Sequence, residues 1–134
     1  MMTDEQKYEY WLDIAEYDLG TAEAMLNGGR WLYVLFMCQQ AIEKLVRGLY
    51  ILYVDDNVPR THNIRVLVEA FENKLPLGVP QDKYSYFDKL TQYYLNNRYP
   101  EYISKLSSQV KESEASSVLS KTKEIFAWLL TLKP

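Results

Sequence analysis

Three short polar clusters contain most of the residues in this sequence that could bind a ligand or catalyse a reaction. They are residues 39–44 (QQAIEK), 61–64 (THNI) and 97–100 (NRYP). Each lies in or beside a segment with the apolar spacing of a packed helix, where a polar group is costly unless it is paired. Arg98 is the first candidate, because a planar guanidinium matches the oxygens of a phosphate group bidentately.

Two charged residues fall on apolar helix faces and therefore need partners. At 100° per residue, Asp18 lies near the middle of an apolar stripe, beside Trp11, Ala22 and Met25. Arg98 lies beside Phe87, Thr91 and Tyr94. Because a buried lone charge is strongly destabilising, we expect Asp18 and Arg98 to meet across the fold. The pair could fix the helix register, or Asp18 could orient Arg98 toward a phosphate; both interpretations stay open.

His62 and Tyr99 have both a structural and a functional interpretation. Imidazole exchanges protons near neutral pH, so His62 could be a catalyst. A lone histidine beside a helix cap is more often a hydrogen-bonded structural residue, and Asp18 or Tyr99 would be its expected partner. Tyr99 precedes Pro100, which ends a helix. We expect the Tyr99 ring either to pack against the chain where the helix ends or to stack on a nucleobase. Lys44 is a further candidate for contact with phosphate.

Composition excludes several classes of protein and site. The chain has 134 residues, enough for one domain over residues 1–134 with a real hydrophobic core. Its 15 basic and 18 acidic residues give a net charge of −3, which argues against DNA as a partner. Cys38 and His62 are the sole residues of their types, so a disulfide within the chain and a cysteine or histidine metal cluster are excluded. We expect no cofactor.

The start of the sequence is polar and charged, without the apolar core of a signal peptide. No apolar run is as long as a membrane-spanning helix. We therefore expect a cytoplasmic protein that does not contact the membrane.

Apolar spacing predicts helices along almost the whole chain. Thr3 and Gln6 form a capping-box pattern that opens the first helix, and residues 27–29 end it. Further helices are expected over about 30–54, from a cap at Thr61 to residue 75, from about 84 to Pro100, and over about 115–132; residues 101–114 are ambiguous. The expected fold is all-α, an antiparallel up-and-down bundle of about five helices.

The second predicted helix has apolar residues on two sides. Its main stripe is opposed by a polar face that is normally solvated, formed by Gln40, Glu43, Lys44 and Arg47. The same broad face also carries Tyr33, Phe36, Met37 and Tyr50. Such a helix is either central in the bundle or shared with a second subunit. We expect a homodimer through Tyr33, Phe36 and Tyr50, with a central helix as the alternative. Glu43 and Arg47 form an i,i+4 pair that supports the helix.

The segments 11–19 (WLDIAEYDL), 39–44, 61–63 and 98–100, taken in this order, resemble the HEPN family. This is a small helical nucleotide-binding domain, often encoded beside a minimal nucleotidyltransferase. The resemblance spans nearly the whole chain. It implies a helical bundle that dimerises, binds nucleotide or RNA, and partners a nucleotidyltransferase. Many HEPN proteins are also metal-independent ribonucleases and toxins of toxin–antitoxin pairs.

The sequence departs from the ribonuclease motif of the HEPN family, an arginine followed after four to six residues by a histidine. Ile103, Ser104 and Lys105 occupy the positions where a histidine would follow Arg98. Asp55, Asp56 and Asn57 occupy the positions where an arginine would precede His62. The departure favours a protein without this catalytic activity, because the reaction needs a group that titrates near neutrality.

Three hypotheses for function follow from the sequence. The first is a non-catalytic dimeric module that binds a nucleotide, a partner nucleotidyltransferase or both, through Arg98, Asp18, His62, Lys44 and Tyr99. The second is a metal-independent ribonuclease of the toxin type that uses Arg98 with His62 or Tyr99. The third is a helical scaffold for protein interaction with no ligand.

Overall fold

The computed structural model describes residues 1–96 and 108–134, apart from the side chains of residues 95 and 96. Two of the expected site residues, Arg98 and Tyr99, lie outside the described residues. The elements are α1 (Asp4–Asn27), α2 (Trp31–Tyr53), α3 (Ile64–Glu69), a 3₁₀ helix (Glu72–Lys74), α4 (Gln81–Asn96) and α6 (Glu112–Leu130). Within these ranges there is no strand, and the all-α prediction is confirmed.

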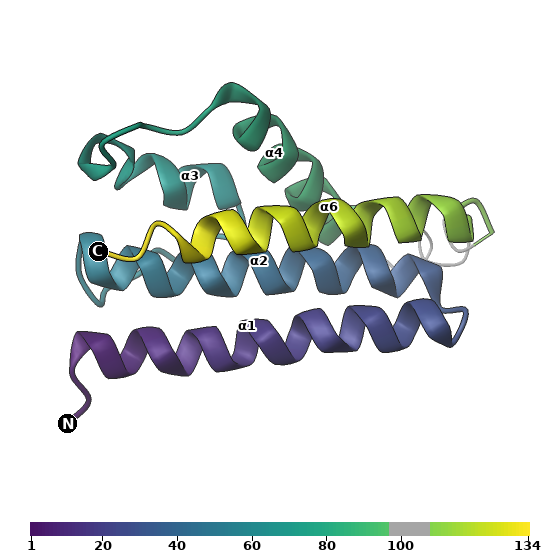
Figure 1. Cartoon of the computed structure of the whole chain (residues 1–134), viewed down its shortest axis with the longest axis horizontal. Helices are drawn as coiled ribbons and strands as arrows, with labels where there is room; N and C mark the ends of the chain where they lie inside the picture. The colour runs from purple at the N-terminus through teal and green to yellow at the C-terminus, as the bar shows by residue number, and fades with distance from the viewer. Residues whose placement is uncertain (97–107) are drawn as a thin grey trace.

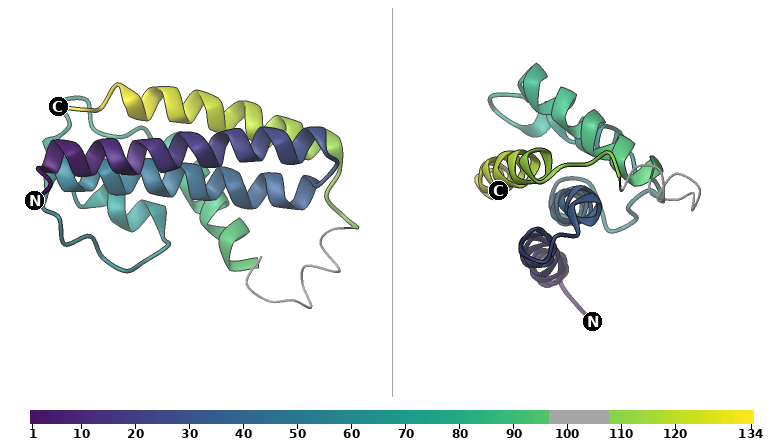
Figure 2. Two further views of the ribbon diagram at one scale, coloured as in Figure 1. Left: turned by 90° about the horizontal axis from the view of Figure 1, so that it is seen from below. Right: turned by 90° about the vertical axis from the view of Figure 1, so that its right-hand side faces the viewer.

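The long helices alternate in direction along the chain, as an up-and-down bundle requires. α1, α2 and α6 lie along the long axis of the molecule, and α4 crosses them diagonally (Figure 1). Viewed from the end, α2 lies between α1 on one side and the pair α4 and α6 on the other (Figure 2). α2 packs against α1, α3, α4 and α6. It is therefore the central helix of the fold.

The central position of α2 explains why it is apolar on two sides. Tyr50 is 8% exposed within the chain, and the Phe36 ring stacks on Tyr94 of α4 at 5.9 Å between centroids. Tyr50 thus packs inside the chain and Phe36 is half-buried against Tyr94, whereas Tyr33 remains exposed. Glu43, on the polar face of α2, is 3% exposed because neighbouring segments of the chain cover it.

Gly48 allows α1 and α2 to approach closely. A Cβ added to this glycine would lie 3.1 Å from Cδ2 of Tyr8 and 3.3 Å from Cβ of Trp11, both on α1. Tyr8 itself is buried, so its ring fills the space beside the glycine. This packing fixes the register of α1 against α2, which positions the polar residues that the two helices share.

The ends of the helices agree in part with the sequence analysis. The capping box of α1 is confirmed: the Gln6 amide N–H donates to Thr3 Oγ1 at 3.1 Å, and the Thr3 N–H donates to Gln6 Oε1 at 2.9 Å. The predicted cap of α3 at Thr61 is wrong. Asn63 is the N-cap, and Thr61 Oγ1 instead accepts from the Asn63 N–H at 3.1 Å, because α3 begins at Ile64.

Among the described helices, none is long and apolar enough to cross a membrane.

Candidate functional site

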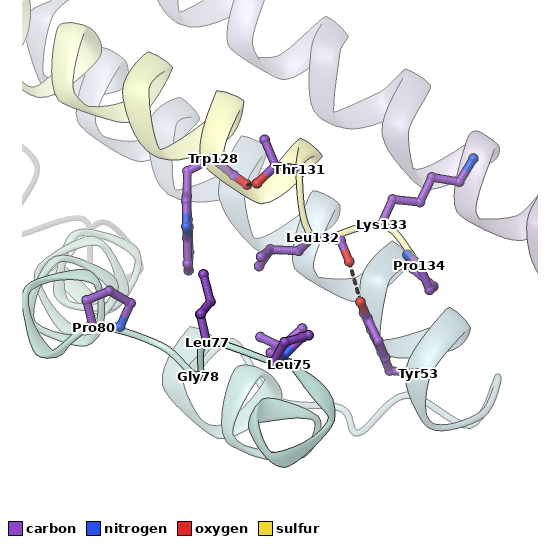
Figure 3. Close-up of a pocket in the computed structure, with 11 residues that line it drawn as sticks. Tyr53, Leu75, Leu77, Gly78, Pro80, Trp128, Thr131, Leu132, Lys133 and Pro134 are labelled. Atoms are coloured by element: carbon purple, nitrogen blue, oxygen red, sulfur yellow. Dashed lines mark hydrogen bonds between the residues drawn. The ribbon is translucent and has the colours of Figure 1, made fainter.

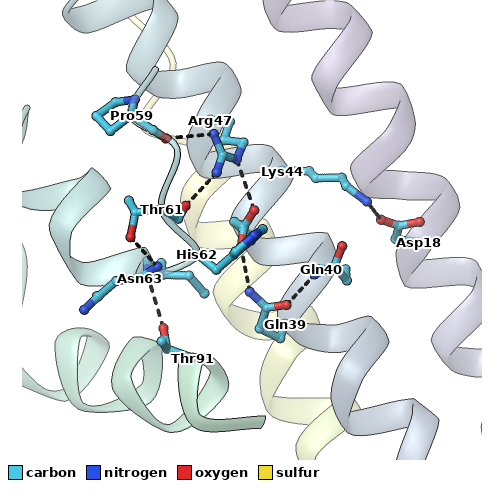
Figure 4. Close-up of polar contacts among 12 residues, drawn as sticks. Asp18, Gln39, Gln40, Lys44, Arg47, Pro59, Thr61, His62, Asn63 and Thr91 are labelled. Carbon is cyan, nitrogen blue, oxygen red and sulfur yellow. Dashed lines mark hydrogen bonds and ion pairs between the residues drawn. The ribbon is translucent and has the colours of Figure 1, made fainter. Parts of the chain in front are cut away.

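The carboxylate of Glu43, which is buried on α2, is the centre of a cluster of polar side chains. This polar cluster consists of Asp18, Gln39, Gln40, Glu43, Lys44, Arg47 and His62. Glu43 Oε1 accepts from Gln39 Nε2 at 2.8 Å and lies 2.9 Å from His62 Nδ1, while Oε2 accepts from Arg47 Nε at 3.0 Å (Figure 4). The Gln39 amide is fully buried, and its Oε1 accepts from Gln40 Nε2 at 2.7 Å. Because residues 39, 43 and 47 are four apart, one face of α2 presents all three side chains in a row.

Arg47 connects this face of α2 to the loop between α2 and α3. Its Nη1 donates to the Pro59 carbonyl at 3.2 Å and its Nη2 to the Thr61 carbonyl at 2.6 Å. With Nε on Glu43, each of its three nitrogens donates a hydrogen bond. Arg47 therefore serves to hold the loop, and no nitrogen of its guanidinium is left without a partner.

The loop places His62 between α2 and α4. The imidazole stacks on the Tyr94 ring with centroids 4.0 Å apart, and Tyr94 in turn contacts Phe36 of α2. The Ile64 N–H, just beyond the loop, donates to Thr91 Oγ1 of α4 at 3.2 Å. The His62 side chain is 44% exposed. The result is a row of three rings, from Phe36 through Tyr94 to a half-exposed imidazole.

Asp18 pairs with Lys44 in the part of the chain that the structure describes. Its carboxylate accepts from Lys44 Nζ at 2.6 Å across the α1–α2 interface, and the two side chains are 11% and 22% exposed. The expected partner, Arg98, lies outside the described residues. Asp18 is buried, as its place on an apolar face predicted. Its pairing with Lys44 confirms that it needs a partner there.

Glu43 is a partner of His62 in the structure. Of the two partners expected for His62, Asp18 pairs with Lys44, and Tyr99 lies outside the described residues. Sequence analysis assigned Glu43 and Arg47 to helix support and missed their contacts with the loop. The signal that could have revealed them is the spacing of Gln39, Glu43 and Arg47 on a helix that has to be buried on two sides. Lys44 and His62 lie on opposite flanks of this row, Lys44 toward α1 and His62 toward α4 (Figure 4).

The charges of the cluster are balanced. Asp18 and Glu43 supply two negative charges, and Lys44 and Arg47 supply two positive ones. A proton on His62 would give the cluster a net charge of +1. Within the part of the chain that the structure describes, no group of three histidine, cysteine, aspartate or glutamate side chains could hold a metal ion.

Comparison with known proteins assigns the family. The family model of the HEPN domain matches residues 8–132. The chain belongs to the HEPN family. The crystal structure of TT1696 from Thermus thermophilus is similar to this HEPN domain, with a TM-score of 0.79 and 24% sequence identity over 93% of this chain and 97% of that chain. At this identity the likeness concerns the fold. No curated protein sequence matches the chain.

Proposed function

We propose that this HEPN domain is a non-catalytic module that binds a nucleotide. The observation that carries the proposal is the row of rings formed by Phe36, Tyr94 and His62, which ends in a half-exposed imidazole. A nucleobase stacks on aromatic faces without regard to its sequence context, and each such contact is worth about 1–3 kcal/mol. The exposed side of His62 is the place where a base extends the row.

The polar contacts of His62 support a binding role because they hold the ring in one orientation. Nδ1 lies on the buried Glu43 carboxylate, and Glu43 is itself fixed by Gln39 and Arg47. An ordered platform loses little conformational entropy when a ligand binds. For the phosphate group of the nucleotide we propose Arg98, which follows Tyr94 by four residues in the sequence, with Tyr99 as a further contact. Lys44 is held by Asp18 on the α1 flank of the row, away from His62, and we assign it no contact with this nucleotide.

The guanidinium of Arg47 already binds Glu43 and two carbonyl groups of the loop, and this favours a non-catalytic protein over a ribonuclease. Cleavage of RNA needs a cation on the developing phosphorane charge as well as a proton carrier. Arg47 is the arginine that shares Glu43 with His62, and all three of its nitrogens are already donating. Arg98 does not have a histidine at the spacing of the family motif.

A metal-independent ribonuclease is the second candidate, and one contact favours it. The pairing of His62 Nδ1 with Glu43 leaves Nε2 as the reactive ring nitrogen, the arrangement that carboxylate–histidine pairs use in general-base catalysis. RNA cleavage that persists in a metal chelator and is lost in both His62→Ala and Arg98→Ala would replace the binding proposal with this one.

Calorimetric titration with ATP, GTP and a short RNA tests the proposed function. We expect binding by the parent protein and a loss of about 5- to 150-fold in His62→Ala, the equivalent of one stacking contact. His62→Phe keeps the ring and is expected to retain most of the affinity. Arg98→Ala is expected to lose affinity for phosphate-bearing ligands, whereas the control Arg65→Ala, which breaks an exposed ion pair with Asp88, is expected to bind as the parent does.

Either of two results would contradict the proposed function. One is a parent protein that binds none of the three ligands while it remains folded by circular dichroism. The other is equal affinity in the parent, His62→Ala and Arg98→Ala, which would place the nucleotide elsewhere. In the first case the scaffold hypothesis becomes the best account.

Assembly is a separate part of the proposal. We propose that the domain forms a homodimer and that a nucleotidyltransferase is its protein partner, on the basis of its membership of the HEPN family. Because Tyr50 is buried and Phe36 is half-buried against Tyr94, Tyr33 is the exposed residue of the expected face. Light scattering of the purified protein tests dimerisation, and Tyr33→Glu tests the contribution of this face.

A further inference from the structure

A pocket lies away from the polar cluster and shares no residue with it. It is a pocket of about 490 Å³ between the segment that joins the 3₁₀ helix to α4 and the C-terminal end of α6. This volume lies within the range of about 300–1,000 Å³ that is typical of sites for small molecules. The main side chains of its wall are Leu75, Leu77, Leu132 and Trp128, and in Figure 3 they converge on the same space.

The exposure of these residues is unusual for apolar side chains. Leu77 is 97% exposed although it lies at the mouth of the pocket, and the indole of Trp128 is half-buried opposite it. Gly78 has φ +61°, a conformation that side chains rarely adopt, and it turns the chain at this point so that Leu77 projects from the loop. Two large apolar groups thus face each other across a space that water alone would occupy.

The side chains of Tyr53, Thr131 and Lys133 in the wall already have polar partners. The Tyr53 hydroxyl donates to the Leu132 carbonyl, and Thr131 Oγ1 donates to the Trp128 carbonyl at 2.5 Å. The Lys133 ammonium is turned toward α1, where it contacts Glu5 and Glu9 (Figure 3). A nearby cation, Lys83, lies 5.4 Å from the centroid of the Trp128 ring and also contacts Asp82.

These contacts restrict the chemistry of the ligand. An anionic ligand would have to displace a glutamate from Lys133, and no aspartate or glutamate side chain among the described lining residues would attract a cationic ligand. An uncharged apolar molecule breaks no existing ion pair and removes Leu77 and Trp128 from water. Burial of apolar surface stabilises binding by about 25 cal/mol per Å² before the cost of association.

We propose that this pocket is a binding site for an uncharged, predominantly apolar small molecule with a planar ring that stacks on Trp128. The proposal is independent of nucleotide binding, because the pocket and the polar cluster have no residue in common. It also predicts discrimination by charge, which an unspecific apolar surface would not provide.

Two fluorescent probes of nearly the same shape test the proposal. N-phenyl-1-naphthylamine is uncharged, and 8-anilino-1-naphthalenesulfonate carries an added sulfonate. We expect the folded protein to bind the uncharged probe at least about tenfold more tightly than the anionic one. Leu77→Asp is expected to weaken binding of the uncharged probe by about tenfold or more, because it places a charge at the mouth. Val66→Asp is the matched control, since Val66 is 47% exposed on α3 and lies outside the pocket.

Nuclear magnetic resonance locates the probe on the protein. The chain has three tryptophans, whose indole N–H signals can be assigned with Trp128→Phe. We expect the uncharged probe to shift the signal of Trp128 and to leave those of Trp11 and Trp31 in place. The proposal is overturned if the parent does not bind the uncharged probe, if the anionic probe binds as tightly, or if Leu77→Asp binds as well as Val66→Asp.

Discussion

Removal of the Glu43 carboxylate tests whether the polar cluster holds the α2–α3 loop in place. In Glu43→Ala, Arg47 keeps its two carbonyl partners but loses its counter-charge at a site where its side chain is 13% exposed. The buried Gln39 amide and His62 each lose an acceptor as well. Removing one partner of a buried ion pair costs about 3–5 kcal/mol. Because Arg47 retains some access to water, we expect a loss of about 2–4 kcal/mol in the free energy of unfolding.

Urea denaturation followed by circular dichroism measures this loss, and a double-mutant cycle separates its causes. Arg47→Ala and the double variant Glu43→Ala/Arg47→Ala complete the cycle. The double variant leaves neither charge unpaired, so it is expected to lose less than the sum of the single variants by about 1–3 kcal/mol. Asp88→Ala is the control; its ion pair with Arg65 is exposed, and we expect a much smaller loss because solvent screens it. Additive single variants, or a Glu43→Ala loss no larger than that of Asp88→Ala, would refute the reasoning.

Three further substitutions or reactions have expected outcomes that follow from packing. Gly20→Ala on α1 meets no atom within 4 Å, so it is expected to stabilise the fold by about 0.5–1 kcal/mol through helix propensity, as urea denaturation would measure. Gly48→Ala places a Cβ 3.1 Å from the Tyr8 ring, so overpacking of about 1–3 kcal/mol should offset that gain and leave the protein less stable; a stability equal to that of Gly20→Ala would contradict this packing. Burial raises the pKa of the Cys38 thiol to about 11, so little thiolate is present below that pH, and Cys38 should react with a disulfide reagent at mildly alkaline pH only when denaturant is added. Rapid labelling of the native protein would contradict the buried position of Cys38.

The sequence was sufficient to predict the helices because their signals are local. The capping box of Thr3 and Gln6 and the apolar spacing of α1, α2, α4 and α6 depend on residues within a few turns of one another. The early end of α3 could not be predicted in this way. Phe71 and Leu75 lie beyond α3 and are still buried at helical spacing, because the turn and the 3₁₀ helix that follow keep their side chains on the same side.

The partners of the site residues depend on distances between elements, which apolar spacing does not contain. The sequence predicted that Asp18 would lie on an apolar face and would need a partner, but its pairing with Lys44 depends on the register of α1 against α2. His62 meets Glu43 because the loop after α2 folds back along that helix, a path fixed by Arg47 and by the contact of Ile64 with Thr91.

The division of the polar cluster between a helical hairpin and a later loop has a consequence for the order of folding. Gln39, Glu43 and Arg47 lie within three turns of α2, and Asp18 reaches Lys44 across a hairpin whose turn is only three residues long. Contacts between residues close in sequence form early, because little loop entropy is lost. The row on α2 therefore forms with the helix itself, whereas the contact of His62 with Glu43 spans 19 residues and that of Asp18 with Lys44 spans 26. The Glu43 carboxylate is thus prepared by its own helix before either of these contacts closes, and the backbone amide proton of His62, which lies in the loop, should exchange with solvent earlier than those of residues 39, 43 and 47 on α2.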